Sequence, residues 1–237
     1  MPRLRVAVEE GGSRRLTMPA AATASGRSLG DVSQLEPGST RYALNECFIG
    51  ESDPSRPLDL EVSVDGGPWS HWRSSGLLVA TQLGASAWLR NATAVDEEQV
   101  AAILHAAASN GLVAKAAHDI PRSQLSAVAQ AASATIVRHE DPEYVQYLVR
   151  DPVPRPAEGS HVRSTVMTGN VGADLYERSV PPHSLGRRVR VRPNGWHAQA
   201  NIDGLPPLVL PPGCVISLEV ESDHGLWFRT LQPWEQR

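Results

Sequence analysis

The sequence predicts an α+β protein: a mostly antiparallel, sandwich-like β body with one inserted helical pair. Runs in which every second residue is apolar occupy both ends of the chain. Two Asp-Gly pairs, Asp65-Gly66 and Asp203-Gly204, stand at the ends of such runs, where tight hairpin turns need residues that tolerate positive φ. Between these β regions, the stretch from Asp96 to Ile136 changes to helical spacing.

Composition limits the classes of function. The 237 residues are 41% hydrophobic and 20% charged, which is ordinary for a globular protein with a sizeable core. A net charge of −4 argues against nucleic acid as the main partner. No apolar run is long enough for a membrane span. Cys47 and Cys214 both lie in apolar, strand-like runs, so we interpret them as core residues rather than as a disulfide or a metal site.

The N-terminal region, residues 1–40, is predicted to be a short strand followed by an irregular segment. Leu4, Val6 and Val8 alternate with polar residues within Arg3–Glu9, as in a half-buried strand. Residues 11–37 are rich in Ala, Ser, Gly and Pro, which indicates a loop. A long irregular segment so near the start suggests that the first strand has lost its partner.

The main domain is predicted to span residues 41–237 and to begin with strands. Leu60, Val62 and Val64 face one way before the Asp65-Gly66 turn. Residues 69–73 are expected to return as the second strand of that hairpin. Residues 76–81 form an apolar run suited to a buried strand.

The middle of the domain is predicted to be helical. Asp96 and Gln99 form a capping-box pattern, and Asn110-Gly111 is a helix stop. A second helix is expected over Arg122–Ile136, after Pro121. The expected inward-facing apolar residues are Val100, Ile103, Leu104 and Ala107 in the first helix and Leu125, Val128, Ala129 and Ala132 in the second.

The C-terminal third is predicted to be β structure again, after a strand near Tyr147–Arg150 and a proline-rich linker. Cys214, Ile216, Leu218 and Val220 form one apolar face, and residues 226–231 a last apolar run. Earlier, Arg188, Arg190 and Arg192 alternate with valines. Such a row could hold phosphates, but we favour a solvated sheet face.

Two polar clusters are the candidate site. Asn45-Glu46 combines an amide with a carboxylate, and the pair could grip ribose hydroxyls. Residues 76–91 have the form strand, glycine turn and helix start, with Thr81 and Ser86 at its polar edge. The N–H groups of such a helix start are expected to be available to a ligand. From the residues alone, a turn and a strand–helix corner remain the simpler interpretations.

Both clusters resemble motifs of the NAD kinase family. The segment Thr81 to Trp88 is similar to the family motif Thr-x-x-Gly-Ser-x-Ala-aromatic, and Asn45-Glu46 to its Asn-Glu pair. The runs 43–52, 63–69, 74–76 and 147–152 and the flanks of Asp203-Gly204 resemble the mitochondrial NAD kinase 2 branch and its bacterial relatives. The resemblance covers about residues 41 to 230 and implies the fold of the family's C-terminal domain.

The resemblance implies ATP-dependent phosphorylation of NAD to NADP with Mg²⁺. The implied substrate-binding residues are Asn45, Glu46, Ser75, Thr81, Gly84, Ser86, Ala87 and Trp88. The Asn-Glu pair would hold the adenosine part, and the Trp88 ring would stack on the dinucleotide or wall its pocket. The family also implies a homo-oligomer such as a dimer, in the cytoplasm of a bacterium or in the mitochondrial matrix.

Two features depart from the family pattern. Gln82-Leu83 and Ala85 replace residues of the motif, and the family's Gly-Gly-Asp-Gly-Thr segment, whose aspartate acts as base, is absent. No catalytic residue or metal ligand is therefore assigned. Two hypotheses remain: a kinase that includes a further domain, favoured by the unpartnered first strand, or a non-catalytic nucleotide-binding or interaction module, favoured by the altered motif.

Overall fold

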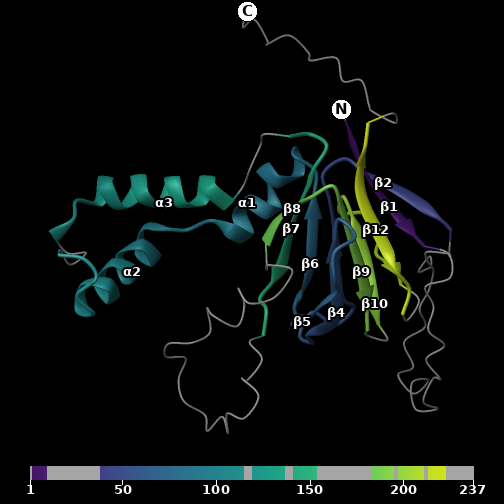
Figure 1. Cartoon of the computed structure of the whole chain (residues 1–237), viewed down its shortest axis with the longest axis horizontal. Coiled ribbons are helices and arrows are strands. Elements are labelled where there is room, and N and C mark those ends of the chain that lie inside the picture. The colour runs from purple at the N-terminus through teal and green to yellow at the C-terminus, as the bar shows by residue number, and fades with distance from the viewer. Residues whose placement is uncertain are drawn as a thin grey trace, which may run out of the picture.

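The computed structural model describes residues 2–9, 38–114, 119–136, 141–153, 183–194, 197–210 and 213–222. Two antiparallel sheets pack face to face (Figure 1). Sheet A has the order β2-β1-β12-β9-β4-β5, and sheet B the order β11-β10-β3-β6-β7-β8. The predicted α+β, sandwich-like architecture is confirmed. The expected loop 11–37, the linker from residue 154 and the run 226–231 lie outside the described residues.

Sheet A is built from the two ends and the middle of the chain. Its strands are β1 (Arg3–Val8), β2 (Thr40–Ala43), β4 (Leu58–Val64), β5 (Ser70–Ser74), β9 (Arg188–Pro193) and β12 (Ile216–Glu221). The expectation that the first strand has lost its partner is wrong: β1 pairs with β12 on one side and with β2 on the other. Sequence proximity could not reveal this, because β12 lies more than two hundred residues away along the chain.

Sheet B carries the candidate site. Its strands are β3 (Glu46–Glu51), β6 (Gly76–Ala80), β7 (Val145–Arg150), β8 (His183–Gly186), β10 (Ala198–Ile202) and β11 (Leu208–Val209). Alternate residues of β3, β6 and β7, such as Cys47, Leu77 and Val149, enter the core between the sheets. Their neighbours in sequence, such as Phe48, Leu78 and Leu148, form a second cluster on the outer face of sheet B.

The helices are inserted between β6 and β7 and project from the sandwich (Figure 1). A 3₁₀ turn, η2 (Gly84–Ser86), leads into α1 (Trp88–Thr93), followed by α2 (Glu97–Ser109) and α3 (Arg122–Ile136). The predicted capping box at Asp96 and Gln99 is confirmed. Of the side chains expected to face inward, Val100 and Ala129 are buried, but Ile103 is 64% and Val128 50% exposed. The helical pair therefore buries fewer apolar side chains than its sequence pattern predicts.

Burial of the β12 side chains in the core gives a stability prediction. Leu218 is fully buried in the central core cluster, whereas Leu205 is 61% exposed in the β10–β11 connection. Leu218→Ala should lower the free energy of unfolding by about 2–5 kcal/mol, because it removes buried methyl groups and leaves a cavity. Leu205→Ala should change it by less than about 0.5 kcal/mol. Urea denaturation of both variants measures the difference, and equal losses would contradict this core assignment.

Candidate functional site

The candidate site begins where the chain crosses from one sheet to the other. Leu44 and Asn45 connect β2 of sheet A with β3 of sheet B. The Asp203 carboxylate accepts hydrogen bonds from three successive N–H groups here: Leu44 (2.5 Å), Asn45 (2.8 Å) and Glu46 (3.0 Å). Successive N–H groups that converge in this way form an anion-binding nest, and the protein fills this nest with its own side chain.

Thr81 holds the opposite side of the same segment. Its hydroxyl lies 2.9 Å from the Leu44 carbonyl and 3.2 Å from the Asn45 carbonyl, and its N–H donates to the Asn45 carbonyl at 2.8 Å. The crossover is therefore fixed through its N–H groups by Asp203 and through its carbonyls by Thr81. Because of this clamp, the Asn45-Glu46 and Thr81 segments lie side by side.

Gly84 allows this close approach. Its N–H donates to the Thr81 hydroxyl at 3.1 Å, and a Cβ placed on Gly84 would overlap the Asn45 backbone. A side chain at position 84 would therefore push the two segments apart. The structure brings together Asn45, Glu46, Thr81 and Gly84 from the set of residues inferred from the sequence.

Glu46 is held in an acidic, partly desolvated position. Burial, and next the negative charge of Asp203, raise the pKa of the Glu46 carboxyl above its ordinary value. Among the described residues, its buried Oε2 has no hydrogen-bond partner, and such an unpaired oxygen is costly. On the core side, burial raises the pKa of the Cys47 thiol to about 12, so this cysteine stays protonated and serves as a core residue, as predicted.

The backbone of Asn45 is held by hydrogen bonds, whereas none is found for its side chain among the described residues. The hydrogen bonds found for Asn45 among the described residues involve its backbone N–H and carbonyl. The fixed backbone thus leaves a primary amide, with a donor and an acceptor, beside the Glu46 carboxylate. Together they form a polar pair that can bind vicinal hydroxyl groups.

The expectation of free N–H groups is wrong at Ala85–Ala87, where the sequence predicts the helix to start. The N–H groups of Gly84, Ala85, Ser86 and Ala87 donate to Thr81 Oγ1 and to the carbonyls of Thr81, Leu83 and Gly84. The Ser86 hydroxyl lies 2.7 Å from the Leu83 carbonyl. The chain forms a 3₁₀ turn at this point, which satisfies these four donors, and α1 begins only at Trp88.

An aromatic and cationic cluster lies next along the outer face of sheet B. The Trp88 and Phe48 rings are 5.2 Å apart between centroids, and the Arg150 guanidinium lies 5.8 Å from each ring. Trp88 is 37% exposed. The sequence analysis did not identify Phe48 and Arg150 as candidate site residues. Both alternate with core residues, on β3 and β7, and this alternation places them on the same sheet face as Glu46.

Ser75 lies at the far end of this face from Thr81. It precedes β6, whereas Thr81 follows it, so about 20 Å of extended chain separates them. The Ser75 hydroxyl lies 2.6 Å from an Asp151 carboxylate oxygen. The structure does not bring Ser75 together with Asn45 and Glu46, and the Phe48 ring lies beside Gly50 and Gly76, near Ser75.

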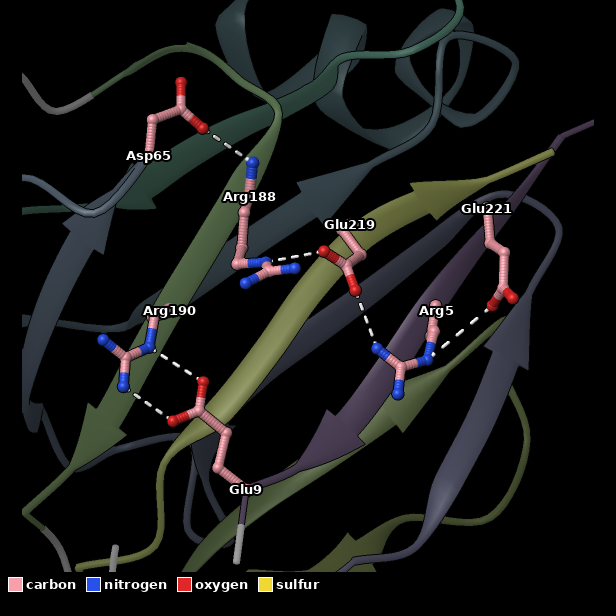
Figure 2. Close-up of polar contacts among 7 residues, drawn as sticks. All are labelled: Arg5, Glu9, Asp65, Arg188, Arg190, Glu219 and Glu221. Carbon is pink, nitrogen blue, oxygen red and sulfur yellow. Dashed lines mark hydrogen bonds and ion pairs between the residues drawn. The ribbon is translucent and has the colours of Figure 1, made fainter.

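The arginine row of β9 is compensated by carboxylates of the same sheet, sheet A. Arg190 forms a two-point contact with Glu9, at 2.8 and 2.6 Å, and Arg188 contacts Glu219 at 2.6 Å (Figure 2). Arg192 contacts Glu61 at 2.7 Å. These guanidinium groups therefore have internal partners, and the row does not have the unpaired positive charge of a phosphate site.

The described residues show neither a metal-binding cluster nor a membrane-spanning helix. They contain no group of three or more His, Cys, Asp or Glu side chains placed to hold a metal ion. No helix among them has the length and apolar character needed to cross a membrane.

Comparison with known proteins finds similarity between this chain and NAD kinases. No family model matches the chain. It is 26% identical to human NAD kinase 2, mitochondrial, over 184 residues, which cover 78% of this chain and 37% of the human protein. The corresponding Xenopus tropicalis protein is 25% identical over 201 residues, which cover 78% of this chain and 42% of that protein. These similarities support an NAD kinase family relationship, although the chain spans less than half of these relatives.

Solved structures with a similar arrangement include yeast NADH kinase complexed with NADH (TM-score 0.46, 13% identity, covering 93% of this chain and 40% of that chain). An NAD kinase from Archaeoglobus fulgidus in complex with ATP has a TM-score of 0.42 and 14% identity, covering 93% of this chain and 50% of that chain.

The Thr81 hydroxyl gives a prediction for the clamp. Thr81→Val keeps the side-chain shape but leaves the Gly84 N–H without its acceptor, so it should lower the free energy of unfolding by about 1–3 kcal/mol. Thr93→Val is the matched control, since that hydroxyl donates to a carbonyl within α1. Chemical denaturation of both variants is the measurement, and equal effects would contradict the clamp.

Glu46 gives a prediction with a defined pH dependence. Its pKa is raised in the folded state, so ionised Glu46 destabilises the fold at neutral pH. Glu46→Gln should therefore raise the free energy of unfolding at pH 7. The gain should disappear as the pH falls below the ordinary glutamate pKa of about 4.3, because Glu46 is then neutral in both the folded and the unfolded chain.

The control for Glu46 is Glu51→Gln, at the other end of β3, where the carboxylate accepts from Ser52. Urea denaturation at a series of pH values compares the two variants. A loss of stability in Glu46→Gln at pH 7 would show that Glu46 is not held in an unfavourable charged state.

Proposed function

We propose that this chain, as a relative of the NAD kinases, is the dinucleotide-binding part of an enzyme that phosphorylates NAD to NADP with ATP. The observation that carries the proposal is the double clamp that holds Asn45-Glu46 against Thr81 and Gly84, with an unpartnered, buried Glu46 oxygen. Such a carboxylate, beside a free amide, matches the needs of an adenosine ribose.

Each polar group has a distinct role in this proposal. The Glu46 carboxylate accepts hydrogen bonds from ribose hydroxyls, which supply the donor that its buried oxygen lacks. The Asn45 amide binds a neighbouring hydroxyl or a base edge. Thr81 and Gly84 act as positioning residues, because their polar backbone and hydroxyl groups are committed to the clamp.

The aromatic cluster supplies the second contact. Trp88, with Phe48 behind it, offers a ring face to a base, and Arg150, whose guanidinium also lies 3.6 Å from an Asp151 oxygen, offers positive charge to a phosphate. Ser86 and Ala87 flank this surface, and Ser75 marks its far end. A dinucleotide has two ring systems joined by a pyrophosphate, and therefore suits an elongated surface with polar groups at one end and rings in its middle.

The proposed ATP and Mg²⁺ are not accommodated by this group of residues. The Asp203 oxygens are committed to three N–H groups, which leaves Glu46 as a single carboxylate, and a hard cation needs several oxygen ligands. We therefore assign no Mg²⁺ ligand and no phosphoryl-transfer step to the described residues. The Gly-Gly-Asp-Gly-Thr segment of the family is also absent from these 237 residues.

A second candidate is a non-catalytic module that binds NAD(H) or another nucleotide, or serves as an interaction domain. It is favoured by Gln82-Leu83 and Ala85, which alter the family motif, and by the occupied N–H groups of η2. A homo-oligomer, most simply a dimer, remains part of the proposal. The names of the relatives favour mitochondria as the compartment over the bacterial cytoplasm.

The test is calorimetric titration of the chain with NAD, followed by an assay for NADP formation with ATP and Mg²⁺. Binding without turnover supports a dinucleotide-binding part that needs a further catalytic segment. Turnover would show that a residue of this chain replaces the family's aspartate. If NAD does not bind, the dinucleotide proposal is wrong and the interaction module is favoured.

Asn45→Ala should weaken NAD binding by about tenfold, since an amide hydrogen bond contributes about 0.5–1.5 kcal/mol. Its thermal unfolding should stay close to that of the parent chain, because the Asn45 hydrogen bonds in the clamp are made by the backbone. Asn110→Ala, at the end of α2, is the control that should bind NAD normally. Equal affinity of all three proteins would remove Asn45 from the site.

A further inference from the structure

The Asp203-Gly204 turn is one of two closely matched turns. In both, an Asp-Gly pair adopts positive φ, with Asp203 at 48° and Gly204 at 69°, and Asp65 at 51° and Gly66 at 77°. Each turn is closed by an N–H···O=C bond across it, from Leu205 to Ile202 and from Gly67 to Val64, both 2.9 Å. These are the features of a tight hairpin turn with positive φ at both central residues.

The two aspartates also contact the neighbouring strand in the same way. The Asp65 N–H donates to the Arg188 carbonyl, and the Asp65 carboxylate accepts the Arg188 N–H at 2.8 Å (Figure 2). The Asp203 N–H donates to the Glu46 carbonyl at 3.1 Å. The difference is in the carboxylates, because Asp65 accepts one backbone N–H of its neighbour, whereas Asp203 accepts three.

We propose that Asp203 is a positioning residue for ligand binding: its carboxylate fixes the Leu44–Glu46 backbone and so sets where the Asn45 and Glu46 side chains meet the dinucleotide. This inference rests on the proposed function and deepens it. Asp203 contacts backbone groups, and no ligand contact is assigned to it. Three hydrogen bonds to one charged acceptor hold a non-ladder segment more firmly than neutral bonds would.

The geometry explains why a carboxylate is needed rather than an amide. Asp203 Oδ1 accepts from Asn45 and Glu46, and Oδ2 accepts from Leu44. An asparagine has one acceptor oxygen and one NH₂ group, so either its NH₂ faces the Leu44 N–H or it loses the other two bonds. The asparagine still tolerates positive φ, and the turn itself is therefore preserved.

The carboxylate also acts on Glu46 through its charge. Two titratable groups interact electrostatically with Glu46: Asp203, from the β10–β11 turn, and Cys47, the next residue on β3. Burial keeps the Cys47 thiol neutral, so the negative charge beside Glu46 comes from Asp203. Removing the Asp203 charge should lower the raised pKa of Glu46. If the ionised form of Glu46 binds ribose hydroxyls, NAD affinity declines as the pH falls through that pKa, and the decline should move to lower pH in the variant.

The experiment compares Asp203→Asn with Asp65→Asn in the full chain, by calorimetric titration with NAD over a range of pH. Asp203→Asn should weaken NAD binding at least tenfold and shift the acid decline to lower pH. Asp65→Asn removes the same carboxylate from the matched turn and should leave both quantities unchanged within twofold. Equal effects of the two variants, or an unchanged affinity in Asp203→Asn, would overturn the proposal.

A second measurement separates this proposal from the proposed function. Amide hydrogen exchange without ligand should speed up at Leu44, Asn45 and Glu46 in Asp203→Asn and not in Asp65→Asn. If the parent chain does not bind NAD, the proposed function fails, and exchange alone decides whether Asp203 holds the segment. If Asp203→Asn does not fold, Asp203→Gly and Asp65→Gly form the replacement pair, because glycine also accepts positive φ.

Discussion

The rest of the site depends on satisfying the backbone where the chain leaves sheet A and enters sheet B. A crossover between sheets has no ladder partner, and unpaired backbone groups that are partly buried are costly. Asp203 satisfies the three N–H groups, and Thr81 satisfies the two carbonyls. The two residues come from the β10–β11 turn and the end of β6. One constraint of folding therefore joins three distant segments, and their side chains meet as a consequence.

The two outer sheet faces divide the chemistry between them. On sheet A, arginines of β1 and β9 alternate with carboxylates of β12 and β4, and the pairs Arg5–Glu219, Arg188–Glu219 and Arg192–Glu61 compensate the charges. Surface and partly buried ion pairs of this kind contribute little stability, but they already engage these guanidinium groups. On sheet B, the face between Glu46 and Ser75 combines an unpartnered carboxylate oxygen, an exposed indole and a guanidinium. Among the described residues, the groups proposed to bind the dinucleotide therefore lie on sheet B.

The sequence predicted the local structure well and the long-range contacts poorly. Alternation, Asp-Gly turns and the capping box depend on residues near one another in the chain, and these features are confirmed at β4, Asp65-Gly66 and Asp96. The pairing of β1 with β12 and the grip of Asp203 on Leu44 depend on contacts that no local pattern encodes. The helix-start hypothesis failed for a related reason, because a 3₁₀ turn satisfied the donors at Gly84–Ala87 that an ideal helix would leave free.

The comparison of Asp65 with Asp203 shows why a motif alone could not reveal the site. Both aspartates have the same reason to precede glycine, since the turn requires positive φ at each position. Their different consequences come from the backbone that each turn meets. Asp65 meets the regular strand β9, where neighbouring N–H groups bond within the sheet, and it can accept one. Asp203 meets the crossover, where three N–H groups need an acceptor. The same two-residue turn therefore closes a hairpin in sheet A and organises the candidate site in sheet B.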